Sequence, residues 1–180
     1  MATAEDIEAL VAKMTEERSK LIGQFDALSE DDAETAPDNA EGEAQWSAKQ
    51  QCCHLAEMET AYRAWVELAL VEDNPDVGTI RGEQVDIPLE QAHDHSISEL
   101  VGQLRAQRQK TLAVIEGLQP SDYDRTASQP MFGTLTVLQW LRSYYRHDRM
   151  HQDQIAGREG SYKPKFITGA EPDQRRTRLQ

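Results

Sequence analysis

The feature that most limits how this chain can fold is a helical spacing of apolar residues, repeated in four long segments. In each segment apolar residues recur every three or four positions, which places them along one face of a helix of about 20 residues. The four segments are residues 3–28, 46–73, 96–118 and 134–157. Since no convincing strand pattern lies between them, the sequence predicts an all-α fold, a four-helix bundle with long connections.

Short capping patterns mark where these helices begin. A side chain that can cap the first turn, followed three residues later by a carboxylate or amide, occurs at Thr3–Asp6, Ser47–Gln50 and Ser96–Glu99. Thr134 is the expected cap of the fourth helix. Residues 29–45 are predicted to be an exposed connection, whereas 73–95 is compatible with a short strand or a turn. Connections of this length leave room for neighbouring helices that run parallel.

Composition and charge exclude several classes of function. The 180 residues suit one domain, expected at 1–160, followed by an irregular C-terminal tail at 161–180. The net charge of −13 is opposite to the basic footprint of a nucleic-acid-binding protein, and it also disfavours an anionic membrane surface. No apolar run is long enough to cross a bilayer, and the acidic N-terminus does not resemble a signal peptide. These features predict a cytoplasmic protein whose partner is a small molecule.

The two cysteines, Cys52 and Cys53, are adjacent in the sequence. Neighbouring side chains on a helix point about 100° apart, so these thiols are poorly placed to form a disulfide with each other. They indicate a reduced, cytoplasmic chain with two buried structural thiols. The alternative is that one of them forms part of the wall of a metal site, since His54 is the next residue.

Two histidines of the last helical segment are candidate metal ligands. His147 and His151 are four residues apart, so both side chains stand on one face of the helix, the face that also carries the apolar residues. His54, in a similar apolar setting in the second segment, is the third candidate. Three imidazoles can bind a divalent ion such as zinc, nickel or ferrous iron and leave a position for water or substrate. The alternative for His147 and His151 is two histidines, exposed or in the core, that are four residues apart by chance.

Two carboxylates are candidates to orient those imidazoles. Glu57 lies one turn after His54, and Asp148 is next to His147. A metal-binding histidine usually donates its second ring N–H to a carboxylate, a carbonyl or a water, which fixes its tautomer. The alternative for each is an ordinary surface or capping carboxylate.

Arg18 and Arg108 interrupt the apolar stripes of the first and third segments, each near the middle of its helix. An arginine at such a place could bind a carboxylate of a substrate, or else extend to the surface or pair with a nearby acid. His93 and His95 lie in a polar stretch just before a helix cap, which indicates a solvated loop. Nucleophile signatures, phosphate-binding loops and dinucleotide fingerprints do not occur, so no catalytic residue is assigned.

Three short motifs, in this order along the chain, resemble the DinB/YfiT-like superfamily. They are Trp46-Ser47, His54-Leu55-Ala56-Glu57, and Gly133-Thr134-Leu135 leading to the run from His147 to Ile155. The resemblance covers residues 4–157. It implies a four-helix bundle in an up-down-down-up order, often dimeric. It also implies a metal bound by one histidine of the second helix and two of the last, which correspond to His54, His147 and His151.

The resemblance also implies a range of functions. Some members resemble transferases or isomerases that use low-molecular-weight thiols such as bacillithiol or mycothiol. We therefore expect a homodimeric protein that binds zinc, nickel or iron and acts on a small molecule, as a thiol-dependent transferase or isomerase or as a hydrolase. One alternative is a non-catalytic protein that sequesters a metal or a small toxic molecule. Another is a dimer in which the metal only ties the helices together.

Overall fold

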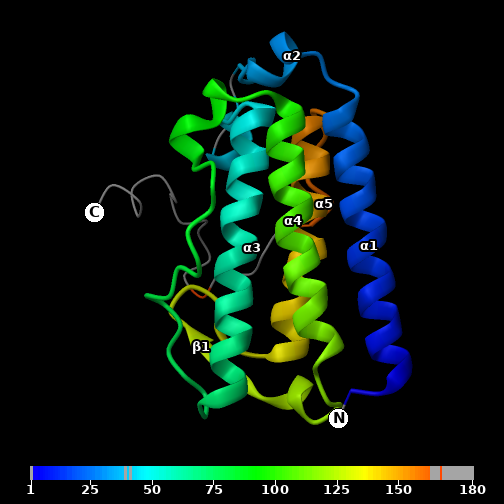
Figure 1. Ribbon diagram of the computed structural model, residues 1–180, viewed down its shortest axis with the longest axis vertical. Helices are drawn as coiled ribbons and strands as arrows, with labels where there is room; N and C mark the ends of the chain where they lie inside the picture. The colour runs from blue at the N-terminus through cyan, green and yellow to red at the C-terminus, as the bar shows by residue number, and fades with distance from the viewer. Residues whose placement is uncertain (1, 39, 41, 163–166, 168–180) are drawn as a thin grey trace.

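The computed structural model describes residues 2–38, 40, 42–162 and 167, and its main feature is a bundle of four long helices (Figure 1). These helices are α1 (Ala4–Asp26), α3 (Ala48–Val71), α4 (Ile97–Glu116) and α5 (Val137–Ile155). In Figure 1, α1 and α5 run upwards and α3 and α4 run downwards. The predicted fold class, a four-helix bundle in up-down-down-up order, is confirmed.

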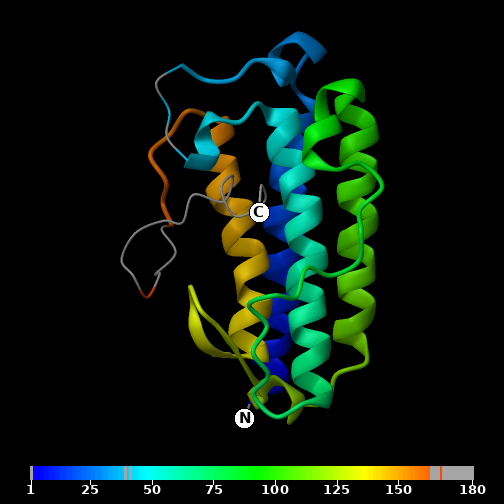
Figure 2. The ribbon, with the colours of Figure 1, turned by 90° about the vertical axis from the view of Figure 1, so that its left-hand side faces the viewer.

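This order puts parallel helices side by side. α1 packs against α5 and α4, while α3 packs against α4 and α5, so the pairs α1–α5 and α3–α4 are parallel. A parallel pair needs a connection that returns along the bundle. The chain between α3 and α4 does this, running the length of α3 before it forms the short 3-10 helix η2 (Leu89–Asp94) (Figure 2). This connection covers one side of α3.

The structure has the predicted cap residue at the start of three long helices and a different one at the start of the fourth. Thr3, Ser47 and Ser96 cap their helices through the expected capping boxes. The fourth cap is Thr136 rather than Thr134, with Gln139 completing its capping box. The reason is a small antiparallel hairpin before the helix, which follows the 3-10 helix η3 (Asp122–Asp124) and consists of β1 (Thr126–Gln129) and β2 (Gly133–Thr136). Strands of four residues are too short to show an alternating pattern.

The connection between α1 and α3 is not simply an exposed loop. It contains a short helix, α2 (Glu30–Glu34), and the 3-10 helix η1 (Gly42–Gln45) at the upper end of the bundle. Ala33 and Trp46 are buried, and so is Glu43, whose side chain is 5% exposed. The expectation of an exposed connection at 29–45 was therefore wrong for Ala33 and Glu43, since the connection folds back onto α3 and α5.

Two apolar clusters fill the bundle, one towards each end, and a layer of buried polar residues separates them. One cluster contains Met14 and Tyr144, and the other contains Leu21 and Leu104. The layer between them is formed by charged, amide and histidine side chains of the four long helices: Glu17, Arg18, His54, Glu59, Arg63, Gln107, Arg108, His147, Asp148 and His151. The candidate site residues lie in this layer, and the apolar packing on both sides holds their helices in place.

Among the described residues, no helix is both long enough and apolar enough to cross a membrane. Most of the predicted tail at 161–180 lies outside the described residues.

Candidate metal centre

Three imidazoles from two helices meet in the polar layer. His54 projects from α3, and His147 and His151 project from successive turns of α5. The Nε2 atom of His147 lies 3.2 Å from Nε2 of His54 and 3.1 Å from Nε2 of His151. His54 and His151 are fully buried, and His147 is 9% exposed. The structure thus brings the three predicted ligands to one point, with the same ring nitrogen of each facing the others.

A hydrogen-bond chain fixes the orientation of His151. Its Nδ1 lies 2.9 Å from Oε1 of Gln51, whose own Nε2 donates to the carbonyl oxygen of Trp46 at 3.0 Å. Because the Gln51 oxygen can only accept, Nδ1 of His151 carries the proton and Nε2 keeps its lone pair. Burial, together with the neighbouring His147 and Arg18, holds the pKa of His151 well below its usual range. The ring is therefore neutral, as a metal ligand must be.

Glu43 completes the cluster from a different part of the chain. Its carboxylate lies 3.3 Å from Nε2 of His54, 3.6 Å from that of His147 and 3.5 Å from that of His151. Both of its oxygens are buried, and no residue in the described part of the chain donates a hydrogen bond to them. One donor atom from each of the four residues lies within 4.8 Å of the others. We refer to Glu43, His54, His147 and His151 as the His3Glu cluster.

The donor set of this cluster fits a divalent metal. Nitrogen ligands about 2.0–2.1 Å from a tetrahedral ion are roughly 3.3 Å apart, close to the spacing of the imidazole nitrogens here. Imidazole and carboxylate together suit zinc, nickel and ferrous iron. Four groups that mostly accept hydrogen bonds face one another away from solvent, and a cation would satisfy all of them at once. The residues that are present therefore fit the metal that the family resemblance implies.

The other charged residues of the layer form a separate network beside the histidines. Arg18 binds Asp148 at 2.7 and 3.1 Å and Glu59 at 2.6 Å. Arg108 binds the same two carboxylates, Glu59 at 2.7 and 3.2 Å and Asp148 at 2.9 Å. Each arginine also donates to a main-chain carbonyl. Each of the four long helices contributes one member to this buried network of two positive and two negative charges.

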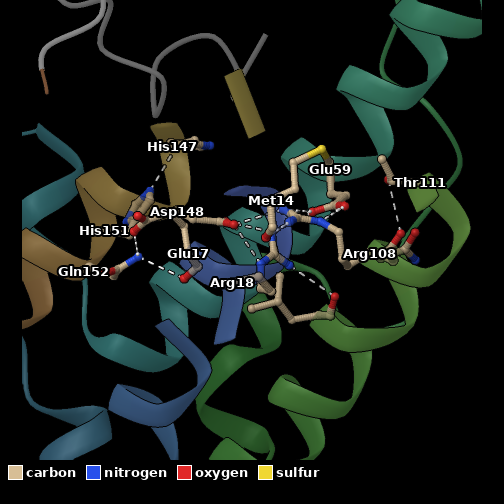
Figure 3. A network of polar contacts seen from close by, with 12 residues as sticks. Met14, Glu17, Arg18, Glu59, Arg108, Thr111, His147, Asp148, His151 and Gln152 are labelled. Carbon is tan, nitrogen blue, oxygen red and sulfur yellow. Dashed lines mark hydrogen bonds and ion pairs between the residues drawn. The ribbon is translucent and has the colours of Figure 1, made fainter. Parts of the chain in front are cut away.

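This network changes the roles that the sequence suggested. Asp148 points away from His147 and His151 towards the two arginines (Figure 3). Its carboxylate orients guanidinium groups and contacts no imidazole, in contrast to the expected role beside His147. Arg18 and Arg108 were candidates either to bind a substrate carboxylate or to pair with a nearby acid, and in the structure they pair with Glu59 and Asp148 inside the bundle. Burial raises the pKa of Glu59, but Arg108 and Arg18 outweigh that effect and lower it to about 2, so the carboxylate stays charged.

The remaining predicted residues lie outside the His3Glu cluster. The carboxylate of Glu57 accepts a hydrogen bond from the backbone N–H of Leu89 at 3.2 Å, so it tethers the connection that follows α3. His93 contacts Ser47 Oγ at 2.9 Å through Nε2. Cys52 and Cys53 are buried and form no disulfide. Burial raises the pKa of the Cys52 thiol, which indicates an unreactive structural cysteine.

A cavity of about 560 Å³ lies between α3, the connection that follows it and the β1–β2 hairpin. Its walls are mainly apolar, with Met58, Trp65 and Met131 among them. No member of the His3Glu cluster lines it. It begins one turn from the cluster, since Met58 follows His54 by four residues on the same face of α3. We call this space the α3 cavity; its volume suits a small organic molecule.

Comparison with known proteins now identifies the family. The sequence model of the DinB superfamily matches residues 13–155, which include the second half of α1, all of α3, α4 and α5, and the three histidines. The chain belongs to the DinB superfamily. Over 151 residues it is 28% identical to the uncharacterized protein YuaE of Bacillus subtilis (strain 168), covering 78% of this chain and 91% of that protein.

Two solved structures share the fold of this DinB-superfamily chain. YfiT from Bacillus subtilis, described as a probable metal-dependent hydrolase with an unusual four-helix bundle topology, matches with a TM-score of 0.70 and 18% identity over 87% of each chain. The mycothiol-dependent maleylpyruvate isomerase matches with a TM-score of 0.63 and 11% identity, over 86% of this chain and 63% of that one. At these identities the comparisons show the fold.

Two members of the site were missed by sequence reasoning. Glu43 lies in a connection that was expected to be exposed, and no spacing rule links it to the histidines. Gln51 lies three residues before His54 and was assigned no role. A weak signal for Gln51 exists, because a buried imidazole needs a partner for its second nitrogen and an amide on α3 can provide one. For Glu43 the sequence carries no such signal.

Proposed function

We propose that this DinB-superfamily protein is a metal-dependent enzyme that acts on a small molecule, either by hydrolysis or by transfer involving a small thiol. The observation that carries the proposal is the convergence of three buried imidazole nitrogens, 3.1–3.2 Å apart around His147, next to a carboxylate that receives no hydrogen bond. His54, His147 and His151 would hold the ion. Zinc and nickel are the favoured ions, with ferrous iron as a third candidate.

When bound, a divalent ion supplies Lewis-acid chemistry, lowering the pKa of a water or thiol in the site towards neutrality. The protein's own residues supply the rest. Gln51 holds His151 in the tautomer whose Nε2 faces the cluster. The Arg18–Glu59–Arg108–Asp148 network holds the four helices together in the same layer. Trp46, whose ring centroid lies 4.7 Å from that of His54, shields one side of the cluster from water.

The size and charge of the protein favour a small substrate. The α3 cavity of about 560 Å³ has room for a molecule of metabolite size, and it begins one turn from His54. The net charge of −13 repels large polyanions such as nucleic acids. Neutral imidazoles leave the full positive charge on a bound metal ion. A thiol that loses its proton in the site becomes a negatively charged thiolate, which that ion would attract. The two solved relatives, one described as a probable hydrolase and one as thiol-dependent, support both reaction classes.

One observation favours a second function. Because Glu43 adds a carboxylate to the three imidazoles, the cluster can surround an ion with four protein groups, a pattern typical of sites that store a metal or use it structurally. Under this alternative the protein sequesters a metal without turnover.

The test combines metal analysis with an activity screen. Protein purified without an affinity tag is analysed for metal, then screened for hydrolysis of small esters and amides and for conjugation of small electrophiles with several thiols. The expected result is about one ion per chain, with activity lost after chelation and in His54→Ala. Stoichiometric metal without turnover would favour sequestration, and activity that survives complete metal removal would contradict the proposal. His93→Ala, outside the cluster, is the matched control and should retain both metal and activity.

A further inference from the structure

The carboxylate of Glu43 is unusual among the acidic residues of this chain. Its side chain is 5% exposed, and neither of its oxygens receives a hydrogen bond from the described residues. The other carboxylates buried in the polar layer all have donors. Glu59 and Asp148 are bound by two arginines each, and Glu17 accepts a hydrogen bond from Gln152 at 3.1 Å. An ionised carboxylate buried without a donor is costly, so this position calls for a positive partner.

The groups nearest to Glu43 show what that partner is. All three imidazole Nε2 atoms lie 3.3–3.6 Å from its oxygens, and His151 is held neutral with a lone pair at this nitrogen. A neutral His151 that directs its Nε2 lone pair at a carboxylate does not stabilise that carboxylate. A cation at the common point would do so, and it would bind all four groups.

We infer that Glu43 is a fourth, exchangeable protein ligand of the metal, which occupies the substrate position at rest and leaves when an anionic substrate group arrives. This inference rests on the proposed metal site. With neutral imidazoles and one carboxylate, the charge at a divalent ion is +1. An incoming anion that replaces the carboxylate keeps that charge unchanged, so the exchange favours anionic groups over neutral ones.

The location of Glu43 allows its carboxylate to leave the cluster while the histidines stay in place. The histidines project from α3 and α5, which are fixed by the core, whereas Glu43 projects from η1, a 3-10 helix of four residues. The backbone carbonyl of Glu43 accepts from the N–H of Trp46 at 3.2 Å, and the Trp46 carbonyl is bound by Gln51. A side-chain rotation at Glu43 can withdraw the carboxylate while this anchor and the three histidines stay in place.

The first experiment separates the role of Glu43 from that of the histidines. Glu43→Gln keeps the side-chain volume and removes the charge, and Glu90→Gln, on an exposed glutamate of η2, is the matched control. Zinc affinity is measured by competition with a chromophoric chelator, and coordination by the visible spectrum of the cobalt-substituted protein. Glu43→Gln is expected to weaken zinc binding at least about ten-fold and to change the cobalt spectrum, with Glu90→Gln unchanged.

The second experiment uses the metal-free protein at pH 8, where no binding is involved. Here Glu43→Gln is expected not to lower the melting temperature, because the Glu43 carboxylate accepts no hydrogen bond from the described residues that the substitution could remove. With saturating zinc, the same variant should gain less stability than wild type. A substitution that only disturbed packing would lower the melting temperature in both states, and that outcome would overturn the inference.

The third experiment tests exchange with azide as the anionic probe. In the cobalt-substituted protein, Glu43→Ala is expected to bind azide at least about ten-fold more tightly than wild type, since the competing carboxylate is gone. Equal azide affinity in both proteins would show that Glu43 does not compete with an anion for the metal, and would overturn the proposed exchange.

Unchanged zinc affinity and cobalt spectrum in Glu43→Gln would overturn the inference and leave the proposed metal enzyme intact. Wild-type protein that binds no stoichiometric metal would overturn the proposed function itself.

Discussion

Replacing Arg108 by glutamine is expected to destabilise the fold rather than to weaken substrate binding alone. The Arg108 guanidinium donates twice to Glu59, once to Asp148 and once to the carbonyl of Met14. With Arg18, these residues form a buried cluster whose formal charges cancel. Without Arg108, two carboxylates share one guanidinium, and the cluster carries a net charge of −1 in a layer from which water is largely excluded.

Removing one partner from a buried charge pair costs about 3–5 kcal/mol of unfolding free energy. For a chain of this length, each kcal/mol corresponds to roughly 2–4 °C of melting temperature, so the expected loss is about 6–20 °C. Arg105, one turn earlier on α4, supplies the control. Its ion pair with Asp26 has a separation of 3.1 Å with both side chains 53% exposed, so Arg105→Gln should cost less than about 1 kcal/mol.

Urea denaturation followed by circular dichroism at pH 7 measures both variants. A second substitution tests the cause: Glu59→Gln in the Arg108→Gln protein makes the cluster neutral again, so the double variant should be less destabilised than the sum of the single variants. If the loss of unfolding free energy in the double variant equals the sum of the losses in the single variants, the charge-balance reasoning is refuted. A stable Arg108→Gln protein that had lost only substrate binding would instead support a substrate-binding arginine.

Three further predictions follow from the same contacts. Gln51→Leu should weaken metal binding about 10–100-fold, because His151 loses the acceptor that fixes its tautomer; a chelator competition assay that gives wild-type affinity would contradict this. Since Arg108 and Arg18 hold the pKa of Glu59 at about 2, below its ordinary 4.5, its stabilising contribution is fully present above pH 4.5 and is lost as the pH falls towards 2. The difference in unfolding free energy between wild type and Glu59→Gln should shrink across that window, and a constant difference between pH 6 and pH 3 would rule this out. Light scattering at micromolar concentration should give twice the 20.4 kDa of one chain, and a monomeric mass would argue against a homodimer.

The sequence by itself determined the parts of this protein that depend on local rules. Helical periodicity and capping residues located all four long helices to within a few residues, since both signals act within one or two turns. The spacing of His147 and His151 placed two imidazoles on one face of α5 for the same reason. The order of the helices came instead from the family resemblance, because the periodicity of each helix does not specify its direction in the bundle.

Only the tertiary structure decided which partners these residues have. The stripe interruptions at Arg18 and Arg108 were visible in the sequence, but their pairing with Glu59 and Asp148 depends on how four helices are rotated against one another. Glu43 reaches the histidines because the connection between α1 and α3 folds back over the end of the bundle. Contacts between residues so distant in the chain are set by packing of the whole core, and no local spacing rule encodes them.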